Sequence, residues 1–254
     1  MNTQNQLIEH LSELKLPTMK KLYEPLARQA ESNSFTFEQY LLELVQKECE
    51  TRRNNTIERY LRQSQLPLEK SLENFDLKRL PLKLRQQFNA LCDGSFVARK
   101  ENVSAFGNPG TGKTHLLCAL CHELIRRGQR VMFSKAPLLV QQLLKAKQEL
   151  KLARVIKALS KFEVLFIDDI GYVKHDRDEI EVLFTLLAER YERGSVLITS
   201  NLPFSKWERI FKDPMTTAAA IDRLVHYCVV LELNLDSYRV EQAKRKTRSA
   251  DQAA

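Results

Sequence analysis

The stretch Gly107-Asn-Pro-Gly-Thr-Gly-Lys-Thr114 decides the fold of this 254-residue chain. It matches the pattern G-x-x-x-x-G-K-[ST] in full, and it lies between a short apolar run at 103–106 and a segment with helical spacing that ends near residue 127. Its glycines let the backbone curl, so that successive N–H groups point inward at phosphate oxygens. The loop also leads into the positive end of a helix. We therefore expect a nucleoside triphosphate site here.

Within this loop, Lys113 is expected to reach the β- and γ-phosphates of ATP, and the Thr114 hydroxyl is expected to bind Mg²⁺. The expected nucleotide-binding residues are Gly107, Asn108, Pro109, Gly110, Thr111, Gly112, Lys113, Thr114 and His115.

From this loop toward the C-terminal part of the chain, apolar runs alternate with segments of helical spacing. Four further strand candidates follow the first, at 130–133, 162–170, 196–199 and 227–233. Helices are expected at 137–160, as one continuous helix, and at 179–193. This alternation predicts an α/β fold with a five-stranded parallel sheet covered by helices on both faces.

The third strand candidate ends in two acids, Asp168 and Asp169. Ligands bind at the carboxyl ends of strands in open α/β sheets. We expect Asp168 to hold Mg²⁺ and Asp169 to polarise the attacking water. The alternative is a solvated turn after the strand.

Asn201 follows the fourth strand candidate and is a further candidate site residue. A neutral amide there can orient the water or the γ-phosphate without repelling it. The alternative is a helix N-cap before Pro203.

Residues 1–65 have the apolar spacing of helices, with a helix start at Ser34 and Glu38 or at Thr36 and Gln39. Gln65-Leu66-Pro67 marks a boundary. We expect a small helical interaction domain at 1–65 and a nucleotide-binding domain at 66–254 that ends in a short basic tail.

The net charge of +8 is unevenly distributed. Residues 123–161 contain ten basic and two acidic residues, and residues 162–200 reverse this to four basic and nine acidic. The basic stretch predicts a polyanionic partner, and the alternative is a solvated helix face. Without interleaved aromatic residues it favours contact with the backbone of double-stranded DNA. The spacing of 147, 151 and 154, with 157 and 161, places five basic residues on one face of the expected helical stretch. The candidate DNA-binding residues on this stretch are Lys145, Lys147, Lys151, Arg154, Lys157 and Lys161.

Other signals exclude further classes of protein. The five cysteines have no secreted-domain spacing, so we expect no disulfide framework. The string Cys118-Ala-Leu-Cys121-His122 resembles a haem attachment site, but it continues the helix opened by the glycine-rich loop, and its cysteines are expected in the core. No apolar run reaches the ~18 residues of a membrane span, and no secretory signal opens the chain. A cytoplasmic protein with no membrane partner is expected.

The chain resembles IstB, the ATPase subunit of a class of bacterial insertion sequences, which belongs to the AAA+ ATPases and is close to the DnaC helicase loader. The resemblance rests on the glycine-rich loop, on Asp168-Asp169 and on the stretches 14–18, 41–48, 200–207, 220–224 and 236–239. It covers nearly the whole chain.

This resemblance implies further roles. Arg223 matches the arginine finger that reaches the γ-phosphate bound by a neighbouring subunit, and Arg239 matches a second phosphate-sensing arginine. Asp169 departs from the glutamate common in AAA+ proteins, which puts the rate of hydrolysis in doubt. Only 21 residues follow Leu233, too few for a full helical lid, so a homo-oligomer with ATP sites between subunits is expected.

The function implied is that of a bacterial ATP-dependent transposition helper. It would oligomerise on double-stranded DNA, remodel or select the target and recruit or activate a transposase, with ATP hydrolysis driving disassembly. Two alternatives stay open: a replicative helicase loader that prefers single-stranded DNA, and an ATP-gated DNA scaffold with negligible hydrolysis.

Overall fold

The computed structural model describes residues 2–171, 177–207, 222, 224–238 and 240. The chain divides into two compact units, Met1–Arg59 and Tyr60–Ala254. The division expected near residue 65 stays a proposal. Within the described ranges, every helix is too short or too polar to cross a membrane.

The first unit is helical. It contains α1 (Thr3–Glu13), α2 (Pro17–Ser32) and the part of α3 (Phe37–Ser64) that ends at Arg59. The buried carboxylate of Glu48 on α3 accepts the backbone N–H groups of Thr18 and Met19 at 2.8 and 3.1 Å. A carboxylate there compensates the positive end of α2, so this contact stabilises the packing of α2 on α3.

The start of α3 agrees with one of the two helix starts that the sequence offers. The Gln39 side chain accepts the Thr36 N–H at 2.9 Å, and the Thr36 hydroxyl accepts the Gln39 N–H at 3.2 Å. This reciprocal capping box satisfies two N–H groups that a helix end leaves without partners. The alternative start at Ser34 is wrong, because the helix begins at Phe37.

The second unit is an α/β fold. Before the sheet lie η1 (Leu72–Asn74), η2 (Leu77–Arg79), α4 (Leu82–Leu91) and α5 (Ser95–Ala98). The sheet and its connections are β1 (Asn102–Phe106), α6 (Lys113–Arg126), β2 (Val131–Lys135), α7 (Ala136–Gln148), α8 (Leu152–Leu159), β3 (Val164–Asp168), α9 (Arg177–Arg190), β4 (Ser195–Ser200), η3 (Phe204–Lys206) and β5 (Cys228–Glu232).

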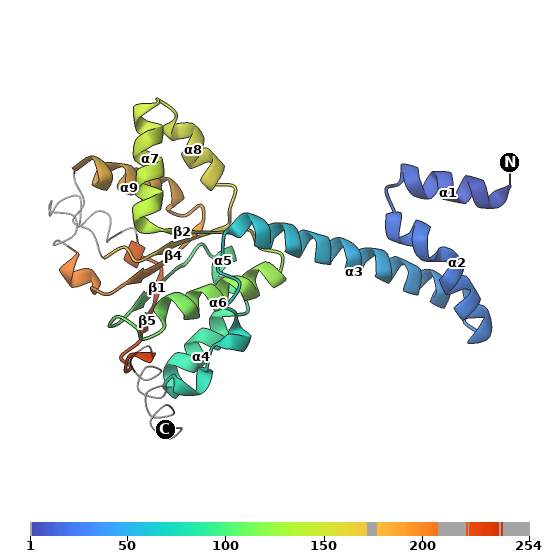
Figure 1. The fold of residues 1–254 in the computed structure, drawn as a ribbon, viewed down its shortest axis with the longest axis horizontal. Coiled ribbons are helices and arrows are strands. Elements are labelled where there is room, and N and C mark those ends of the chain that lie inside the picture. Colours follow the sequence, from blue (N-terminus) through green and yellow to red (C-terminus); the bar gives the residue numbers. More distant parts are fainter. Residues whose placement is uncertain (1, 172–176, 208–221, 223, 239, 241–254) are drawn as a thin grey trace, which may run out of the picture. The chain divides into compact units, whose positions relative to one another are not determined.

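The five strands are parallel and lie in the order β2-β3-β4-β1-β5, which confirms the predicted sheet. Helix α6 packs on one face, while α7, α8 and α9 cover the other (Figure 1). Strands β1, β3 and β4 are buried along their whole length, as a sheet covered on both faces requires.

The expectation of one helix from 137 to 160 is wrong. Helix α7 ends at Gln148 and α8 begins at Leu152. Leu150 between them has φ +56° and is 95% exposed, and the next N–H donates to the Ala146 carbonyl at 2.7 Å. This bond closes the end of α7 as in a helix C-terminal cap. The apolar spacing continues on both sides of the break without glycine or proline, so the sequence carries no stop signal there.

The strand order places the site. Because β4 lies between β1 and β3, the loop after β1, the acids after β3 and the polar residues after β4 all emerge at one edge of the sheet. Parallel strands present their carboxyl ends together, and ligands bind there in open α/β sheets.

Candidate nucleotide-binding site

The glycine-rich loop, 107–112, joins β1 to the N-terminus of α6. Gly110 has φ +84° and lies against Ser237, and Gly112 has φ +100° and would place a Cβ 3.2 Å from the Phe75 ring. Both positions combine a left-handed backbone with a close neighbour. A side chain at either would therefore strain the loop and crowd it, which explains the two glycines.

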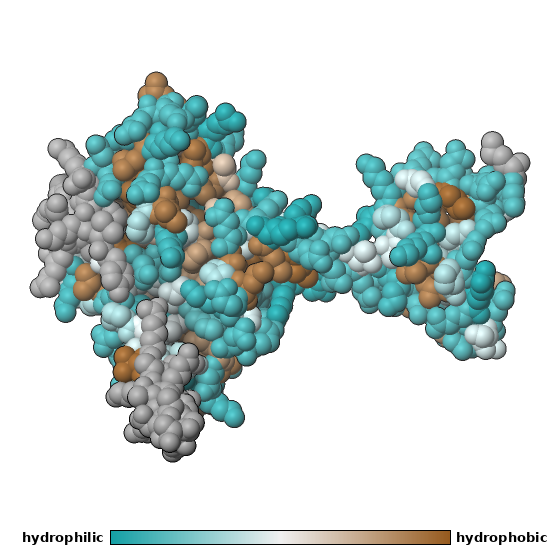
Figure 2. Space-filling model, viewed as in Figure 1, coloured by the Kyte–Doolittle hydropathy of each residue, from teal (hydrophilic) through white to brown (hydrophobic). Residues whose placement is uncertain are grey.

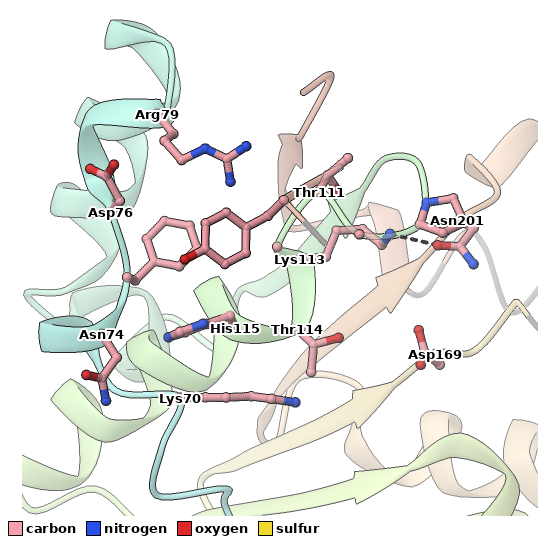
Figure 3. Close-up of a pocket in the computed structure, with 15 residues that line it drawn as sticks. Lys70, Asn74, Asp76, Arg79, Thr111, Lys113, Thr114, His115, Asp169 and Asn201 are labelled. Carbon is pink, nitrogen blue, oxygen red and sulfur yellow. Dashed lines mark hydrogen bonds between the residues drawn. The ribbon is translucent and has the colours of Figure 1, made fainter. Parts of the chain in front are cut away.

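The Lys113 ammonium is held inside the loop. The residue is 5% exposed, and its Nζ donates to the carbonyls of Gly107 and Asn108 at 2.7 and 2.9 Å and to Asn201 Oδ1 at 2.7 Å (Figure 3). The loop, the start of α6 and the end of β4 therefore converge on one cation. Such a cation is suited to bind phosphate oxygens.

Thr114 and Asp168 lie side by side at the same edge. The Thr114 hydroxyl donates to Asp168 Oδ1 at 2.8 Å, and the Thr199 hydroxyl donates to the same oxygen at 2.6 Å. Asp168 is 3% exposed. A hydroxyl beside a buried carboxylate is a set of hard oxygen donors that fits Mg²⁺, which is usually bound by one or two protein oxygens together with substrate phosphates and water.

Asp169 has the left-handed backbone angle φ +60°, and its N–H donates to the Thr199 hydroxyl at 2.8 Å. This turn directs the side chain away from the buried strand, and Figure 3 shows the carboxylate at the side of the pocket that Lys113 and Asn201 also line. The two consecutive acids are therefore placed differently, with Asp168 against Thr114 and Asp169 on the cavity wall.

Lys113, Thr114, Asp169 and Asn201 line a cavity of about 310 Å³, together with the loop residues 109–112. Six of the fifteen lining residues carry no signal in the sequence, because they come from the segment before the sheet and from the segment after β5. The missed lining residues are Lys70, Asn74, Phe75, Asp76, Arg79 and Tyr238. The Arg79 guanidinium lies 4.8 Å from the centre of the Tyr238 ring. Apart from two prolines that bound the segment 67–81, no local pattern points to these positions.

His115 lines the cavity, as expected of a nucleotide-binding residue, but its Nε2 is engaged with the Ser71 carbonyl at 3.0 Å. Its ring also meets Phe75 edge to face, with 5.1 Å between the ring centres. Burial lowers the pKa of His115 and so favours the neutral ring that donates this hydrogen bond. The structure therefore gives His115 a contact with the segment before the sheet that the sequence did not predict.

The cysteines of the apparent haem string are part of the core. Cys118 and Cys121 are fully buried on α6 beside Leu117 and Leu120. Burial raises the pKa of Cys118 to about 12 and the pKa of Cys121 further above its usual value. His122 is engaged with the Pro67 carbonyl at 3.2 Å. Cys118 and Cys121 are therefore core residues, as predicted from the sequence. His122 has a structural role through its contact with Pro67.

The six candidate DNA-binding residues do not lie on one helix, and the five expected on a single face are divided, because the helix breaks after Gln148. Lys147 pairs with Asp178 and Glu181 of α9 at 3.2 and 3.0 Å, and Lys151 pairs with Glu149 at 2.9 Å. The remaining four are exposed: Lys145, Arg154, Lys157 and Lys161. Within the described ranges none of these four forms an ion pair, so a smaller basic set than expected stays available.

The two arginines expected to sense the γ-phosphate, Arg223 and Arg239, lie outside the described residues. The same holds for most of the tail after β5, so the expected lack of a full lid stays a prediction. Trp207, in the stretch that follows Asn201, is fully buried and donates its Nε1–H to the Leu202 carbonyl at 3.0 Å. That bond fixes the turn that begins at Asn201.

The chain matches one protein-family model and several relatives over most of its length. The family model for IstB-like ATP binding proteins matches residues 9–247. An insertion-sequence ATP-binding protein of Sinorhizobium fredii is 41% identical over 94% of this chain and 80% of its own length. The corresponding protein of the insertion sequence IS21 from Pseudomonas aeruginosa is 38% identical over 93% of this chain and 89% of its own length.

Solved structures support the fold. A crystal structure of DnaI has a TM-score of 0.56 at 23% identity and covers 66% of this chain and 94% of that one. The DnaC helicase loader has a TM-score of 0.53 at 18% identity and covers 65% of this chain and 97% of that one. DnaA from Aquifex aeolicus, bound to AMPPCP, has a TM-score of 0.55 at 21% identity over 73% of this chain and 56% of its own.

Proposed function

Because the chain belongs to the family of IstB-like ATP binding proteins, which are AAA+ P-loop ATPases, we propose that it is the ATP-dependent helper of a bacterial insertion sequence. It binds ATP with Mg²⁺ at the loop 107–114 and oligomerises on double-stranded DNA in the cytoplasm. There it remodels or selects the target and recruits or activates a transposase. Hydrolysis of ATP then drives disassembly.

The observation that carries this proposal is the convergence of Lys113, Thr114 and Asn201 on one cavity beside the N-terminus of α6, with Asp168 hydrogen-bonded to Thr114. The helix end and the loop N–H groups supply a positive field for the phosphates, and Lys113 adds a full charge. Thr114 and Asp168 would hold Mg²⁺, which when bound neutralises charge on the β- and γ-phosphates.

The remaining site residues, Asp169 and Asn201, act on the attacking water and on the γ-phosphate. The Asp169 carboxylate faces the cavity and accepts a hydrogen bond from that water, which orients it and makes it more nucleophilic. The Asn201 amide also faces the cavity, and as a neutral group it positions the γ-phosphate without repelling it. Aspartate is shorter than the glutamate common at position 169 in this superfamily, so the turnover is expected to be slow.

Arg223 completes the site from a neighbouring subunit in this proposal. A guanidinium supplied there neutralises the charge that develops in the transition state, an effect of about 10³–10⁵ in rate in related NTPases. Hydrolysis then depends on assembly. Arg239 is proposed as a second contact to the phosphates.

Contact with DNA is assigned to the four exposed basic residues of α7, α8 and the following turn. Figure 2 shows that the surface over α7 and α8 is largely hydrophilic. Long basic side chains on such a surface bind phosphates with little dependence on sequence, so target choice then rests on the deformability of the duplex.

The helical region 1–65 is proposed as the interaction domain for the transposase. Several of its large apolar side chains are exposed to solvent, among them Leu14 at 67% and Phe37 at 92%. Leu41 and Leu42, one turn after Phe37, are also more than half exposed. Exposed apolar groups of this kind favour a protein partner.

A second candidate function is favoured by the fold alone. DnaC and DnaI share the fold of the second unit, so a helicase loader would use the same ATP site but prefer single-stranded DNA. A third candidate is an ATP-gated DNA scaffold with negligible hydrolysis. It is favoured by the aspartate at position 169, where AAA+ proteins commonly have glutamate, and such a scaffold would release no phosphate.

The test measures oligomer size and duplex binding of the full chain with ATP, with ADP and without nucleotide. We expect ATP to promote both, and Lys113→Ala to abolish ATP binding and both effects. Arg223→Ala should keep ATP binding and lose turnover in the assembled state. A clear preference for single strands would support the loader, and a protein that stays monomeric with ATP and duplex would overturn the proposal.

A further inference from the structure

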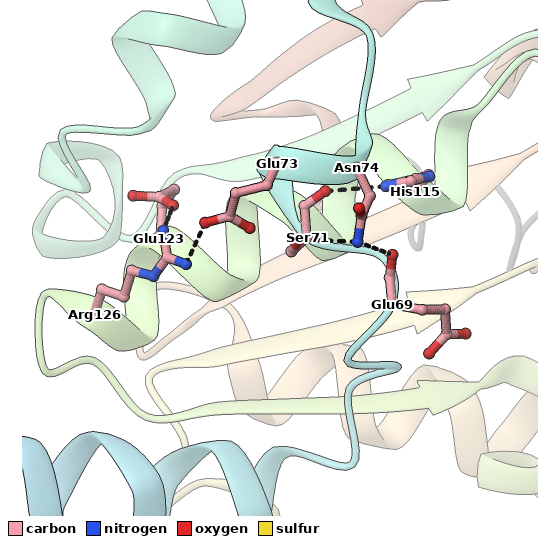
Figure 4. Close-up of polar contacts among 7 residues, drawn as sticks. All are labelled: Glu69, Ser71, Glu73, Asn74, His115, Glu123 and Arg126. Carbon is pink, nitrogen blue, oxygen red and sulfur yellow. Dashed lines mark hydrogen bonds and ion pairs between the residues drawn. The ribbon is translucent and has the colours of Figure 1, made fainter.

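The segment before the sheet, residues 66–80, is attached to the outer face of α6, the helix that begins at the nucleotide loop. His115 Nε2 is hydrogen-bonded to the Ser71 carbonyl, and Arg126 pairs with Glu73 at 2.7 Å (Figure 4). His122 Nε2 is hydrogen-bonded to the Pro67 carbonyl. These three residues of α6 are seven and four positions apart, so they follow one side of the helix. We call residues 66–80 the connecting segment.

The backbone around Lys70 in this segment is fixed on both sides. The Glu69 carbonyl accepts the Asn74 side-chain N–H at 3.0 Å, and the Ser71 carbonyl is engaged with His115. The Lys70 N–H donates to the Pro67 carbonyl at 3.2 Å. These three hydrogen bonds fix the backbone from which the Lys70 side chain extends, which limits where its ammonium can lie.

The Lys70 side chain crosses the floor of the cavity. Figure 3 shows it extending from the connecting segment beneath His115, with its ammonium on the side of Thr114 and Asp169. Lys70 lines the same cavity as Lys113 and is partly buried. Across the described ranges, its ammonium has no hydrogen bond and no ion pair.

Lys70 is partly buried as a residue, and no group in the described ranges pairs with its ammonium, so this charge is available to an anion in the cavity. The exposed lysines of the same segment and of α4, such as Lys78 and Lys83, keep their hydration. An anion in the cavity would supply the missing partner. The cavity already presents Lys113, the loop N–H groups and the end of α6 to phosphates.

We propose that Lys70 is a second lysine that binds the phosphates of the nucleotide, supplied in cis by the connecting segment. This inference rests on the proposed binding of ATP at the loop 107–114. Lys113 reaches the phosphates from the loop, and Lys70 reaches them from the opposite wall. The hydrogen bonds of Figure 4 position Lys70, so the connecting segment is part of the binding site.

The test compares the full chain with Lys70→Met, which keeps the length of the apolar stem and removes the charge. ATP affinity is measured at low and at high salt. We expect Lys70→Met to weaken ATP binding about 10-fold at low salt, the size of one charge-assisted hydrogen bond, and to reduce the salt dependence of the affinity. Lys70→Arg should retain most of the affinity, because it restores the charge.

Lys78→Met is the matched control, because Lys78 lies on the same segment but is exposed and does not line the cavity. It should bind ATP as the unmodified chain does. Thermal unfolding of each variant checks that the connecting segment is intact, and an unchanged melting temperature for Lys70→Met separates lost binding from lost structure.

The outcomes distinguish the two proposals. If the unmodified chain binds no ATP, the proposed function fails. If Lys113→Ala loses ATP while Lys70→Met binds it normally, the ATP site stands and the role of Lys70 is overturned. An equal loss of affinity at low and high salt, or no rescue by Lys70→Arg, would also overturn it, since either result indicates packing and not charge.

Discussion

Lys113 Nζ lies 2.7 Å from Asn201 Oδ1, although the two residues are 88 positions apart. The contact joins the start of α6 to the end of β4 across the mouth of the cavity. The amide is thus a partner of the lysine that we propose to bind phosphate, so the charge of residue 201 should affect ATP binding.

Asn201→Asp should weaken ATP binding by about 10-fold or more, because a carboxylate at this position would neutralise Lys113 and repel phosphate. Asn201→Ala should leave ATP affinity within a few-fold and lower turnover by about 10²-fold, since it removes only a positioning group. Equilibrium binding and phosphate release measure the two effects. Equal ATP affinity in both variants would contradict the importance of this contact.

Asp168→Asn should remove the dependence of ATP binding on Mg²⁺ without abolishing the binding itself. The amide oxygen still accepts the hydroxyls of Thr114 and Thr199, so the fold should persist, but the negative charge is lost. We expect the increase in ATP affinity on adding Mg²⁺ to disappear, while the affinity in EDTA stays close to that of the unmodified chain. A full Mg²⁺ response in this variant would remove Asp168 from the metal site.

The four exposed basic residues should determine the salt dependence of DNA binding. Replacing Lys145, Arg154, Lys157 and Lys161 with Gln should make the log–log salt slope shallower by roughly 3 to 4. Lys147→Gln is the matched control, because Lys147 already pairs with Asp178 and Glu181. A slope that stays the same in the fourfold variant would move the DNA contact elsewhere.

Thiol labelling of the native protein should distinguish core cysteines from a reactive pair. Cys49 is exposed, whereas Cys118 and Cys121 are fully buried with raised pKa values. A pKa of about 12 leaves a thiolate fraction of about 10⁻⁴ at pH 8. Cys49 should therefore react first, and Cys118 and Cys121 only after unfolding. Rapid labelling of Cys118 in the native state would contradict the packing of α6.

The attachment of the connecting segment should weaken in acid. Hydrogen bonding to Ser71 and Arg126 lowers the pKa of Glu73 from 4.5 to about 2. A carboxylate whose pKa is lowered by folding stabilises the folded state above pH 4.5 and loses this contribution as the pH falls from 4.5 toward 2.

Thermal unfolding between pH 6 and pH 3 tests this effect. Glu73→Gln should melt below the unmodified chain at pH 6, and the gap should narrow below pH 4.5. Glu69→Gln is the control, because its exposed side chain has no hydrogen bond or ion pair in the described part of the segment, and it should show no such gap. A constant gap for Glu73→Gln across this range would argue against the ionic contact with Arg126.

The sequence alone predicted the architecture of the second unit, a five-stranded parallel sheet covered by helices on both faces. Each strand is a short apolar run and the loop 107–114 is a contiguous pattern, so both are specified by residues close to one another in the chain. The sequence assigned Thr114 and Asp168 to one expected Mg²⁺ site, and the structure brings their side chains together, because parallel strands present their carboxyl ends at one edge. Local periodicity failed at Leu150, where a left-handed residue without glycine ends α7.

Only the tertiary structure decided which distant segments complete the cavity. Lys70, Phe75 and Tyr238 belong to no local pattern, and they reach the loop because His115, His122 and Arg126 hold the connecting segment against α6 and the Tyr238 N–H donates to the Gly110 carbonyl at 3.0 Å. Such contacts depend on the free energy of packing between residues far apart in the chain. Spacing within the sequence does not encode them, and this is why six of the fifteen lining residues became visible only in the folded chain.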